Sequence, residues 1–457
     1  MNTCKLLLTI TLTATLSQSI TAQTKNGTAD AQGQKAAAEK PAAPTTVEFD
    51  HKRFDELRKE GFDALYNLDY EGARRHFTEM TREFPNHPAG YQFLAAGLWL
   101  RTLNESRRLQ ASLYNNEGFY KEDKNDKGDT KTADEFKELT RRTKELCENR
   151  LVRDPKDVDA LYYLGASEGL KAAWGSMVER SFMSALRNGN DSVDHHRDLL
   201  KIDPTFTDAK VTVGMYDYVV GALPLPVKIL ASIGGFRGSK KRGLATLEQV
   251  AREGNWAKDD AKSLLIALLK REGRFRDAYT YANELATKYP RNYLFKMEAA
   301  DALVSQAEVE RASNPEAAKK TEAEAFAVFD ALLAPQRGPN APHPPLDLVH
   351  YNYGEALLVA GQPERAAKEM LAAATLPNAE SSMVTRARLR AAQALDVAGK
   401  REEALTQYKA VLALPDVFDS HEDAKRGIKE PYKLTHKVGE NALGDEAADG
   451  SKGEQAH

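Results

Sequence analysis

The chain has 457 residues, of which 42% are hydrophobic and 29% are charged, and its formal net charge at pH 7 is −3. This length is ample for a large buried core, and the near-neutral balance excludes the clustered basic surface with which nucleic-acid-binding proteins displace counterions. No nucleic-acid partner is therefore expected.

The first 22 residues have the pattern of a secretory signal peptide. Lys5 precedes an apolar stretch from Leu6 to about Leu16, and small and polar residues then lead to Ala22, where cleavage is expected, with Ser19 as the alternative position. The apolar stretch is too short to cross, as a helix, a bilayer core roughly 30 Å thick. The sequence predicts an exported protein, periplasmic or extracellular, with association to the envelope left open and an uncleaved membrane anchor as the alternative.

Removal of residues 1–22 leaves a single cysteine. Cys4 lies before the apolar stretch, which argues against a lipid-modified cysteine, and cleavage removes it together with Lys5. The mature chain then carries 63 of the 64 Lys and Arg side chains, against 67 Asp and Glu. Because Cys147 alone cannot form an internal disulfide, packing must stabilise the exported protein.

Two terminal segments have the composition of disordered chain. Residues 23–46 consist mainly of Ala, Gln, Lys, Gly, Pro and Thr and contain no aromatic residue, and residues 436–457 have the same character. Such segments cannot bury enough apolar surface to offset the entropy lost on ordering. We expect a disordered linker, a folded region over residues 47–435 and a disordered tail.

A repeat begins near the start of the folded region. Counting from Phe54, small residues stand at positions 8 and 20, large apolar residues at 4, 24 and 27, and a proline at 32. Small residues let two helices approach, large ones fill the seam between them at helical spacing, and the proline ends the second helix. These residues are Leu57, Gly61, Ala73, Phe77, Met80 and Pro85.

This pattern resembles the tetratricopeptide repeat (TPR), a helix–turn–helix unit of 34 residues. The same frame recurs in three later windows. They contain Leu265, Leu269, Ala278, Leu285 and Pro290; Tyr353, Gly354, Leu357, Ala366, Met370 and Ala373; and Ala392, Leu395, Ala404, Tyr408 and Val411. The resemblance implies an all-α fold, a right-handed superhelical solenoid of helical hairpins, in a secreted bacterial-type member of the TPR superfamily.

The repeats are unevenly spaced. Unit starts fall near residues 54, 88, 158, 207, 259, 293, 347 and 385, which predicts about eight hairpins. Several intervals exceed 34 residues, and we expect the extra residues to lie inside the units, as inserted or extended helices. Stacked units are expected because one hairpin cannot bury its own apolar face.

The centre of the chain is similar to a narrower family. The runs Gly221–Leu230, Gly234–Gly238 and Lys241–Leu244 are similar to a segment of the eukaryotic inclusion-body-clearance TPR family, which is associated with the mitochondrial outer membrane. The similarity covers only about 40 residues of this chain. It implies a helix inserted before the second helix of that unit and carries no function across.

The same region is the most apolar part outside the repeats. Val219–Phe236 is interrupted only by Lys228 and two prolines, and a basic group follows it. Such a segment fits a membrane-surface element or lid, with the basic group on lipid headgroups. A helix packed inside the solenoid is the favoured interpretation, because a Leu-Pro-Leu-Pro entry followed by one apolar helix is ordinary core, and a solvated turn explains the basic group equally well. The basic residues are Arg237, Lys240, Lys241 and Arg242.

One loop resembles a calcium-binding loop without meeting its requirements. Asp123, Asn125 and Asp129 have suitable spacing around Gly128, but Lys127 occupies a ligand position and Asp134 replaces the final bidentate Glu. A cation in the cage would oppose calcium. A charged loop and no metal site are expected.

The remaining residues that could carry chemistry, two histidines and a cysteine, are expected to be structural. His195 and His196 are adjacent, so on a helix they point about 100° apart and cannot hold one ion. His196 and Cys147 fall at inward repeat positions, where a buried imidazole and a buried thiol are usual. The chain contains no metalloprotease, nucleophile-elbow, P-loop or dinucleotide motif. We expect no catalysis and no cofactor, with a site inside the inserted helices as the alternative.

The concave groove of such a solenoid is lined by positions 2, 5, 9 and 12 of each first helix. Aromatic, Met, Arg, Gln and Glu side chains at these positions are typical of a surface that binds a peptide. The candidate residues are Arg58, Phe62, Gln92, Trp99, Tyr162, Met215, Tyr218, Met297, Tyr351, Glu355, Arg386 and Gln393. The alternative is that inserted helices fill the groove. A Lys/Arg clamp for a C-terminal carboxylate has no clear counterpart.

The sequence therefore predicts an exported scaffold that binds a protein or peptide through its concave surface. The alternative is a membrane-surface accessory protein of envelope or lipid traffic that uses residues 219–236. The sequence leaves the partner and the oligomeric state open.

Overall fold

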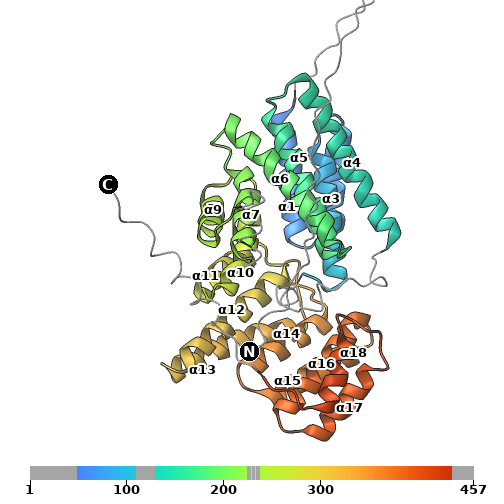
Figure 1. Ribbon diagram of the computed structural model, residues 1–457, viewed down its shortest axis with the longest axis vertical. Coiled ribbons are helices and arrows are strands. Elements are labelled where there is room, and N and C mark those ends of the chain that lie inside the picture. The colour runs from blue at the N-terminus through green and yellow to red at the C-terminus, as the bar shows by residue number, and fades with distance from the viewer. Residues whose placement is uncertain (1–48, 110–128, 224–227, 229–231, 233–236, 435–457) are drawn as a thin grey trace, which may run out of the picture. The chain divides into compact units, whose positions relative to one another are not determined.

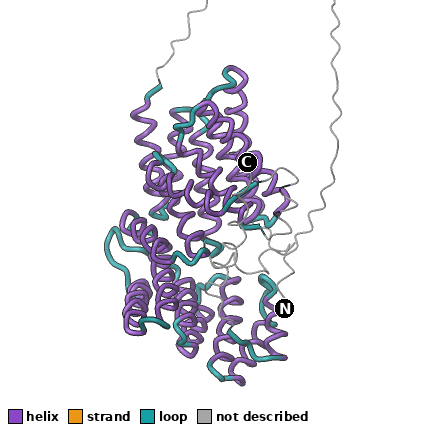
Figure 2. The backbone as a smooth tube through the Cα atoms, turned by 60° about the vertical axis from the view of Figure 1, so that its left-hand side comes forward, coloured by secondary structure: helices purple, strands orange, loops and turns teal. Residues whose placement is uncertain are grey.

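The computed structural model describes residues 49–109, 129–223, 228, 232 and 237–434. The chain divides into two units, Met1–Phe49 and Asp50–His457, and all the helices described belong to the second. Seventeen α-helices and one 3-10 helix are found in the described residues, which contain no strand (Figure 2). The predicted signal peptide, linker and tail lie outside the described residues.

Sixteen of the helices form eight successive hairpins (Figure 1). The pairs are α1 (His51–Tyr66) with α2 (Tyr70–Glu83), α3 (Ala89–Glu105) with α4 (Thr130–Arg153), α5 (Val158–Met177) with α6 (Phe182–Ile202), α7 (Lys210–Gly221) with α9 (Lys240–Glu253), α10 (Lys258–Arg271) with α11 (Phe275–Lys288), α12 (Tyr293–Arg311) with α13 (Pro315–Leu333), α14 (Leu346–Val359) with α15 (Pro363–Thr375), and α16 (Ser381–Val397) with α17 (Arg401–Val411). The short helix η3 (Thr207–Ala209) precedes α7, and α18 (Ser420–Lys429) follows the last hairpin. The predicted all-α, TPR-like fold is confirmed.

The repeat frame read from the sequence matches the hairpins closely. Each predicted unit start lies within four residues of the first residue of α1, α3, α5, α7, α10, α12, α14 or α16. Most of the extra residues lie inside units, as predicted, in long helices such as α4 and in the connections from α3 to α4 and from α7 to α9. Residues 334–345 are an exception, because they connect two units rather than lying within one. Their five prolines prevent either helix from continuing.

Close approach of the two helices in a hairpin depends on glycine at position 8. A Cβ on Gly61 would lie 2.2 Å from the Phe77 ring, and one on Gly354 would lie 2.6 Å from Met370 Cγ. Phe77 and Met370 are both fully buried and both occupy position 24. The predicted small-against-large pairing across the seam is therefore confirmed.

A pair of glycine substitutions tests this packing. Gly61→Ala forces a methyl group into the Phe77 ring, which should cost about 1–3 kcal/mol, partly offset by about 1 kcal/mol of helix propensity. Gly97→Ala in α3 is the matched control, because its Cβ would meet only Leu65 Cδ1 at 3.8 Å. Denaturant unfolding followed by far-ultraviolet circular dichroism should show Gly61→Ala destabilised and Gly97→Ala unchanged or stabilised. Equal effects of the two changes would contradict the packing argument.

The two ends of the insertion between α7 and α9 are held together by glycines. A Cβ on Gly221 would lie 2.3 Å from the backbone nitrogen of Lys240, and one on Gly238 would lie 2.6 Å from the carbonyl oxygen of Asp217. A Cβ on Gly243 would lie 2.5 Å from the backbone nitrogen of Tyr218. The backbones on either side of the insertion are therefore in direct contact.

Helices far apart in the sequence also pack together. Tyr66, at the end of α1, stacks on Tyr289 with 4.9 Å between ring centroids, and the Asn292 side-chain amide donates to the carbonyl oxygen of Tyr66 at 2.7 Å. Tyr293 donates its hydroxyl proton to Asn104 at 2.7 Å, which joins α12 to α3. These contacts span 189 to 226 residues of sequence, so the first three helices pack against the segment around α12.

Candidate functional site

The inner face, formed by the first helices of the hairpins, is largely used within the chain. None of the twelve residues predicted to line a groove is classed as exposed. The six buried ones are Gln92, Tyr218, Met297, Tyr351, Arg386 and Gln393. The six partly buried ones are Arg58, Phe62, Trp99, Tyr162, Met215 and Glu355.

Arg58 and Tyr162 meet in an aromatic cluster around Trp256. The Arg58 guanidinium lies over the Trp256 ring, 4.0 Å from its centroid, in a cation–π contact. The Tyr162 ring lies 5.1 Å from Phe206 and 6.2 Å from Trp256. Phe62 packs elsewhere, 4.7 Å from Phe93. Arg58, Tyr162 and Phe62 were predicted to contact a partner, but each contacts an aromatic ring of this chain instead.

A group of carboxylates lies next to this cluster. Tyr66 donates its hydroxyl proton to Asp260, while Asp259 accepts from Lys288 Nζ and from the Tyr289 hydroxyl, each at 2.6 Å. Asp260 is exposed over part of its surface, but its carboxylate lies against the Tyr66 hydroxyl and near the charges of Asp259 and Asp208. Desolvation raises the pKa of Asp260 to about 6, the Tyr66 hydrogen bond opposes this rise, and the two neighbouring charges add to it. Asp260 therefore titrates well above the ordinary range of an aspartate.

This raised pKa predicts a pH dependence of stability. The folded chain keeps a proton on Asp260 that the unfolded chain releases near pH 4, so the contribution of Asp260 is full below about pH 4 and is lost as the pH rises through 6. Asp260→Asn should avoid this loss and gain stability relative to the wild type between pH 4 and pH 7. Urea unfolding across that range measures the difference, with Asp134→Asn in α4 as a control at another exposed aspartate. A constant difference between Asp260→Asn and wild type would contradict the assignment.

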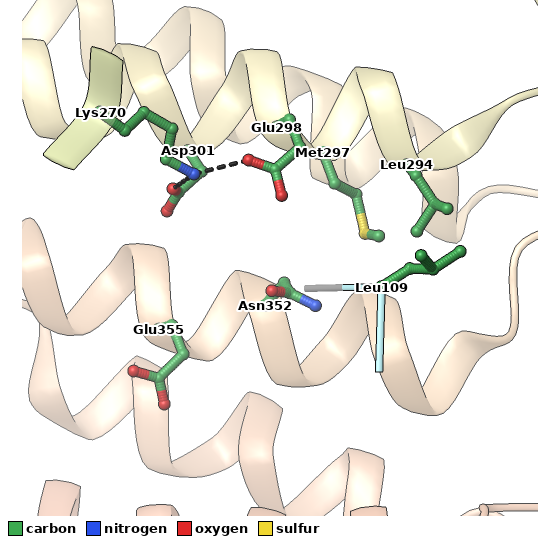
Figure 3. A pocket seen from close by; sticks show the side chains of 8 residues that line it. All are labelled: Leu109, Lys270, Leu294, Met297, Glu298, Asp301, Asn352 and Glu355. Carbon is green, nitrogen blue, oxygen red and sulfur yellow. Dashed lines mark hydrogen bonds and ion pairs between the residues drawn. The ribbon is translucent and has the colours of Figure 1, made fainter. Parts of the chain in front are cut away.

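A small cavity separates α10 and α12 from α14 (Figure 3). Its volume is about 40 Å³. It brings together Met297 and Glu355, two of the predicted inner-face residues, with charged groups that were not predicted. The lining residues are Leu109, Lys270, Leu294, Met297, Glu298, Asp301, Asn352 and Glu355.

Lys270 lies between two carboxylates on one wall of this cavity. Its Nζ is 2.6 Å from Glu298 Oε2 and also pairs with Asp301 (Figure 3). Burial lowers the pKa of Lys270, but Asp301 and Glu298 outweigh it and hold the pKa well above its ordinary value. The ammonium is therefore permanently charged and balanced within the fold.

A second ion pair lies on α14 and α16. The Arg390 guanidinium donates to both carboxylate oxygens of Glu355 at 2.6 Å and to Gln393 Oε1 at 2.6 Å. The Arg386 guanidinium lies over the Tyr351 ring, 4.9 Å from its centroid. Glu355 and Gln393 are thus joined through Arg390, and Arg386 is paired with Tyr351.

The Glu355–Arg390 pair should stabilise the fold. Glu355→Ala would leave the Arg390 guanidinium without its carboxylate, at a cost of about 2–3 kcal/mol, below the 3–5 kcal/mol typical of a fully buried pair. The reason for the reduction is that each side chain keeps about a quarter of its surface exposed, 26% for Glu355 and 23% for Arg390. The exposed pairs of Arg141 with Glu138 and Glu145 provide the control, and Arg141→Ala should change the free energy of unfolding by less than about 1 kcal/mol. Denaturant unfolding compares the two variants, and equal losses would show that the inner pair contributes no more than a surface pair.

The other predicted inner-face residues do not join these clusters. Tyr218 is 1% exposed and donates its hydroxyl proton to Glu272 at 2.8 Å. Met215 packs against the same hydrophobic core as Tyr218, and Trp99 packs with Trp174 near α4. Gln92 is buried in α3. These residues serve as core.

The sequence did not reveal the charged inner residues. Lys270, Glu298, Asp301 and Arg390 stand in first helices that are otherwise rich in Ala and Leu. A charge at an inward position of such a helix is the signal that could have found them, because charged side chains are seldom buried without partners. Which charges pair is set only when α10, α12, α14 and α16 are brought together.

The predicted core residues behave as expected. His196 is 2% exposed, with Nε2 3.0 Å from the carbonyl oxygen of Tyr162, and burial lowers its pKa to about 4. Cys147 is a buried free thiol, and burial raises its pKa well above the ordinary value.

Asp129 caps α4 by accepting from the backbone of Thr132 at 3.0 Å. The rest of the loop that resembles a calcium site, residues 123–128, lies outside the described residues.

A larger, open cleft lies beside α1. It measures about 570 Å³ and is formed where the first hairpin meets the turn between α11 and α12 and the connection before α14. The lining is polar and carries both charges. It consists of Glu60, Asp63, Ala64, Asn67, Asp69, His76, Lys288, Pro290, Arg291 and Asn340.

The two hollows differ in what they can hold. The inner cavity of about 40 Å³ has room for one or two water molecules at most. The cleft of about 570 Å³ is large enough for part of a ligand, but it is open and polar, unlike the mostly apolar pockets that enclose small molecules, so it suits a polar ligand. The cleft is therefore the better candidate site, and its lining residues come from segments that the sequence alone does not bring together.

Comparison with known proteins gives only distant similarities. No protein-family model and no curated protein matches the sequence. Among solved structures, the human IFIT1 dimer with PPP-AAAA aligns at 12% identity over 84% of this chain and 86% of that chain, with a TM-score of 0.43. Yeast Tom70 aligns at 14% identity over 83% and 95%, with a TM-score of 0.34. A tetratricopeptide repeat protein from Parabacteroides merdae aligns at 13% identity over 74% and 99%, with a TM-score of 0.30. The TPR-like character of this chain therefore rests on its own hairpins and their spacing.

Proposed function

We propose that this chain is an exported, non-catalytic TPR-like scaffold that binds a protein or peptide partner. The observation that carries the proposal is the open polar cleft of about 570 Å³ beside α1. The inner face predicted from the sequence is a weaker candidate, because even a partly exposed residue such as Glu355, with 26% of its side chain exposed, is paired with Arg390.

The lining of the cleft suits a polypeptide. Asn340 offers an exposed amide donor and acceptor, and the carboxylates and the guanidinium of Arg291 add charged ones, whereas the Asn67 amide already bonds to the backbone of Asp63 and Arg291. A peptide backbone needs both donors and acceptors when it leaves water. A cleft with both kinds along its walls can satisfy such a backbone.

The non-catalytic part of the proposal is supported by the state of the reactive side chains. The ring of His196 packs against Gly165 and is neutral near pH 7, because burial lowers its pKa to about 4. Cys147 is held as a thiol rather than a reactive thiolate. In the part of the chain that the structure describes, no group of three metal-ligating side chains is found. A catalytic site in the inserted segments is the alternative.

Export is proposed from the sequence of residues 1–22. Expression of the whole chain in a bacterial host, followed by N-terminal sequencing of the periplasmic fraction, tests it. The expected mature product begins at Gln23, or at Ile20 if cleavage follows Ser19. Recovery of the chain from the membrane with Met1 intact would show that residues 1–22 are an uncleaved membrane anchor rather than a signal peptide.

The alternative role at a membrane surface receives less support. Two of the four basic residues after the apolar segment are paired within the chain, Lys240 with Glu272 at 3.0 Å and Arg242 with Asp217 at 2.7 Å. Val219 is 45% exposed, but most of residues 224–236 lie outside the described residues. No helix in the described part of the chain is long and apolar enough to span a bilayer. Flotation with anionic vesicles separates the two roles, since a scaffold for soluble partners should not float.

Site-specific photocross-linking in the native envelope tests the scaffold proposal. A photoreactive residue at Asn340, which is exposed and lines the cleft, should give a cross-linked product of defined mass. The same residue at Val152, which is 83% exposed and lies at the end of α4, is the matched control. A product at Asn340 and none at Val152 would place a partner at the cleft. Equal labelling at both positions, or none, would remove the cleft from the proposal.

A further inference from the structure

The charges that line the cleft are unequally balanced. Lys288 Nζ lies 2.6 Å from Asp259 Oδ2, a carboxylate that does not line the cleft, so its charge is already neutralised. The Arg291 guanidinium lies 3.7 Å from Asp69 Oδ2, so these two lining charges neutralise each other. The lining carboxylates that remain are Glu60 and Asp63.

Glu60 and Asp63 lie on one face of α1, three residues apart. Like charges at this spacing repel one another on a helix. Glu60 contacts His76 Nδ1 at 3.3 Å, which balances its charge only when that ring is protonated. Within the described residues, the Asp63 carboxylate forms no ion pair or hydrogen bond. In the part of the chain that the structure describes, neither Glu60 nor Asp63 is paired with a lysine or an arginine, so this wall of the cleft carries negative charge that no such side chain balances.

The geometry points to a partner segment of positive charge. We propose that the cleft binds a peptide segment that carries lysine or arginine, with the cationic side chain placed between Glu60 and Asp63. A cation there would relieve the repulsion between the two carboxylates and form charge-assisted hydrogen bonds with them. The exposed amide of Asn340 lines the same cleft and can meet the peptide backbone, whereas the amide of Asn67 is bonded to the backbone of Asp63 and Arg291. This inference rests on the proposed scaffold function and gives the chemistry of its partner.

Fluorescence anisotropy with short labelled peptides tests the inference on the purified whole chain. The probes are an alternating Lys-Ala hexapeptide and the corresponding Glu-Ala hexapeptide, at about 0.15 M ionic strength so that distant charges are screened. The test variant is Glu60→Gln with Asp63→Asn. The matched control is Glu402→Gln with Glu403→Gln, two exposed carboxylates in the first turn of α17 that give the same change in net charge.

The expected result is a selective loss of affinity. The wild type and the α17 variant should bind the Lys-Ala peptide within about twofold of each other, and the α1 variant should bind about tenfold or more weakly. The Glu-Ala peptide should not bind. Circular dichroism verifies that both variants are folded.

Three outcomes would overturn the inference. No binding of the Lys-Ala peptide by the wild type would remove the cationic partner, and equal losses in both variants would show a diffuse effect of net charge. Binding of both peptides would show that charge does not select. In each case a cross-linked product at Asn340 would still support the scaffold function, whereas absence of that product would count against the function itself.

Discussion

The contact between the end of α1 and the turn before α12 determines most of what is special about this chain. Tyr66 stacks on Tyr289 and accepts a hydrogen bond from Asn292, across 226 residues of sequence. Because of this contact, the inner face of the first hairpin packs against the start of α10. Arg58 of that face packs on Trp256, and Tyr66 bonds to Asp260. The same contact places the outer side of α1 beside Arg291, where the open cleft is formed.

The parts of the fold that could be predicted are those set by short-range packing. A pair such as Gly61 and Phe77 lies within one repeat, and its small-against-large pattern recurs at a fixed spacing, so the hairpins and their starting points can be read from the sequence. The same reasoning identified His196 and Cys147 as core residues, because each falls at an inward position of its own unit. Local sequence also explains the proline-rich residues 334–345, although the prediction wrongly assumed that all the extra residues lie inside units.

The candidate site could not be predicted because it depends on pairings between units. Position within a repeat predicted Tyr351, Arg386 and Gln393 to line the groove, but it could not show that α14 and α16 would bury them. Lys270 pairs with Glu298 and Asp301 of the next hairpin, and Glu355 likewise pairs with Arg390 of the hairpin that follows it. The cleft is even harder to predict from the sequence, because Glu60 and Asn340 line it together only as a result of the long-range contact at Tyr66. A regular repeat specifies neighbours, whereas the site arises from residues that are not neighbours.

The glycines at Gly221, Gly238 and Gly243 have a consequence for how this protein can be altered. Because these glycines allow the backbones at the two ends of the insertion to touch, the chain leaves α7 and enters α9 at nearly the same place. The cost of closing a longer loop grows only slowly with its length. A longer connection at this junction would therefore add little loop-closure entropy, which makes it a suitable place for an engineer to add a segment.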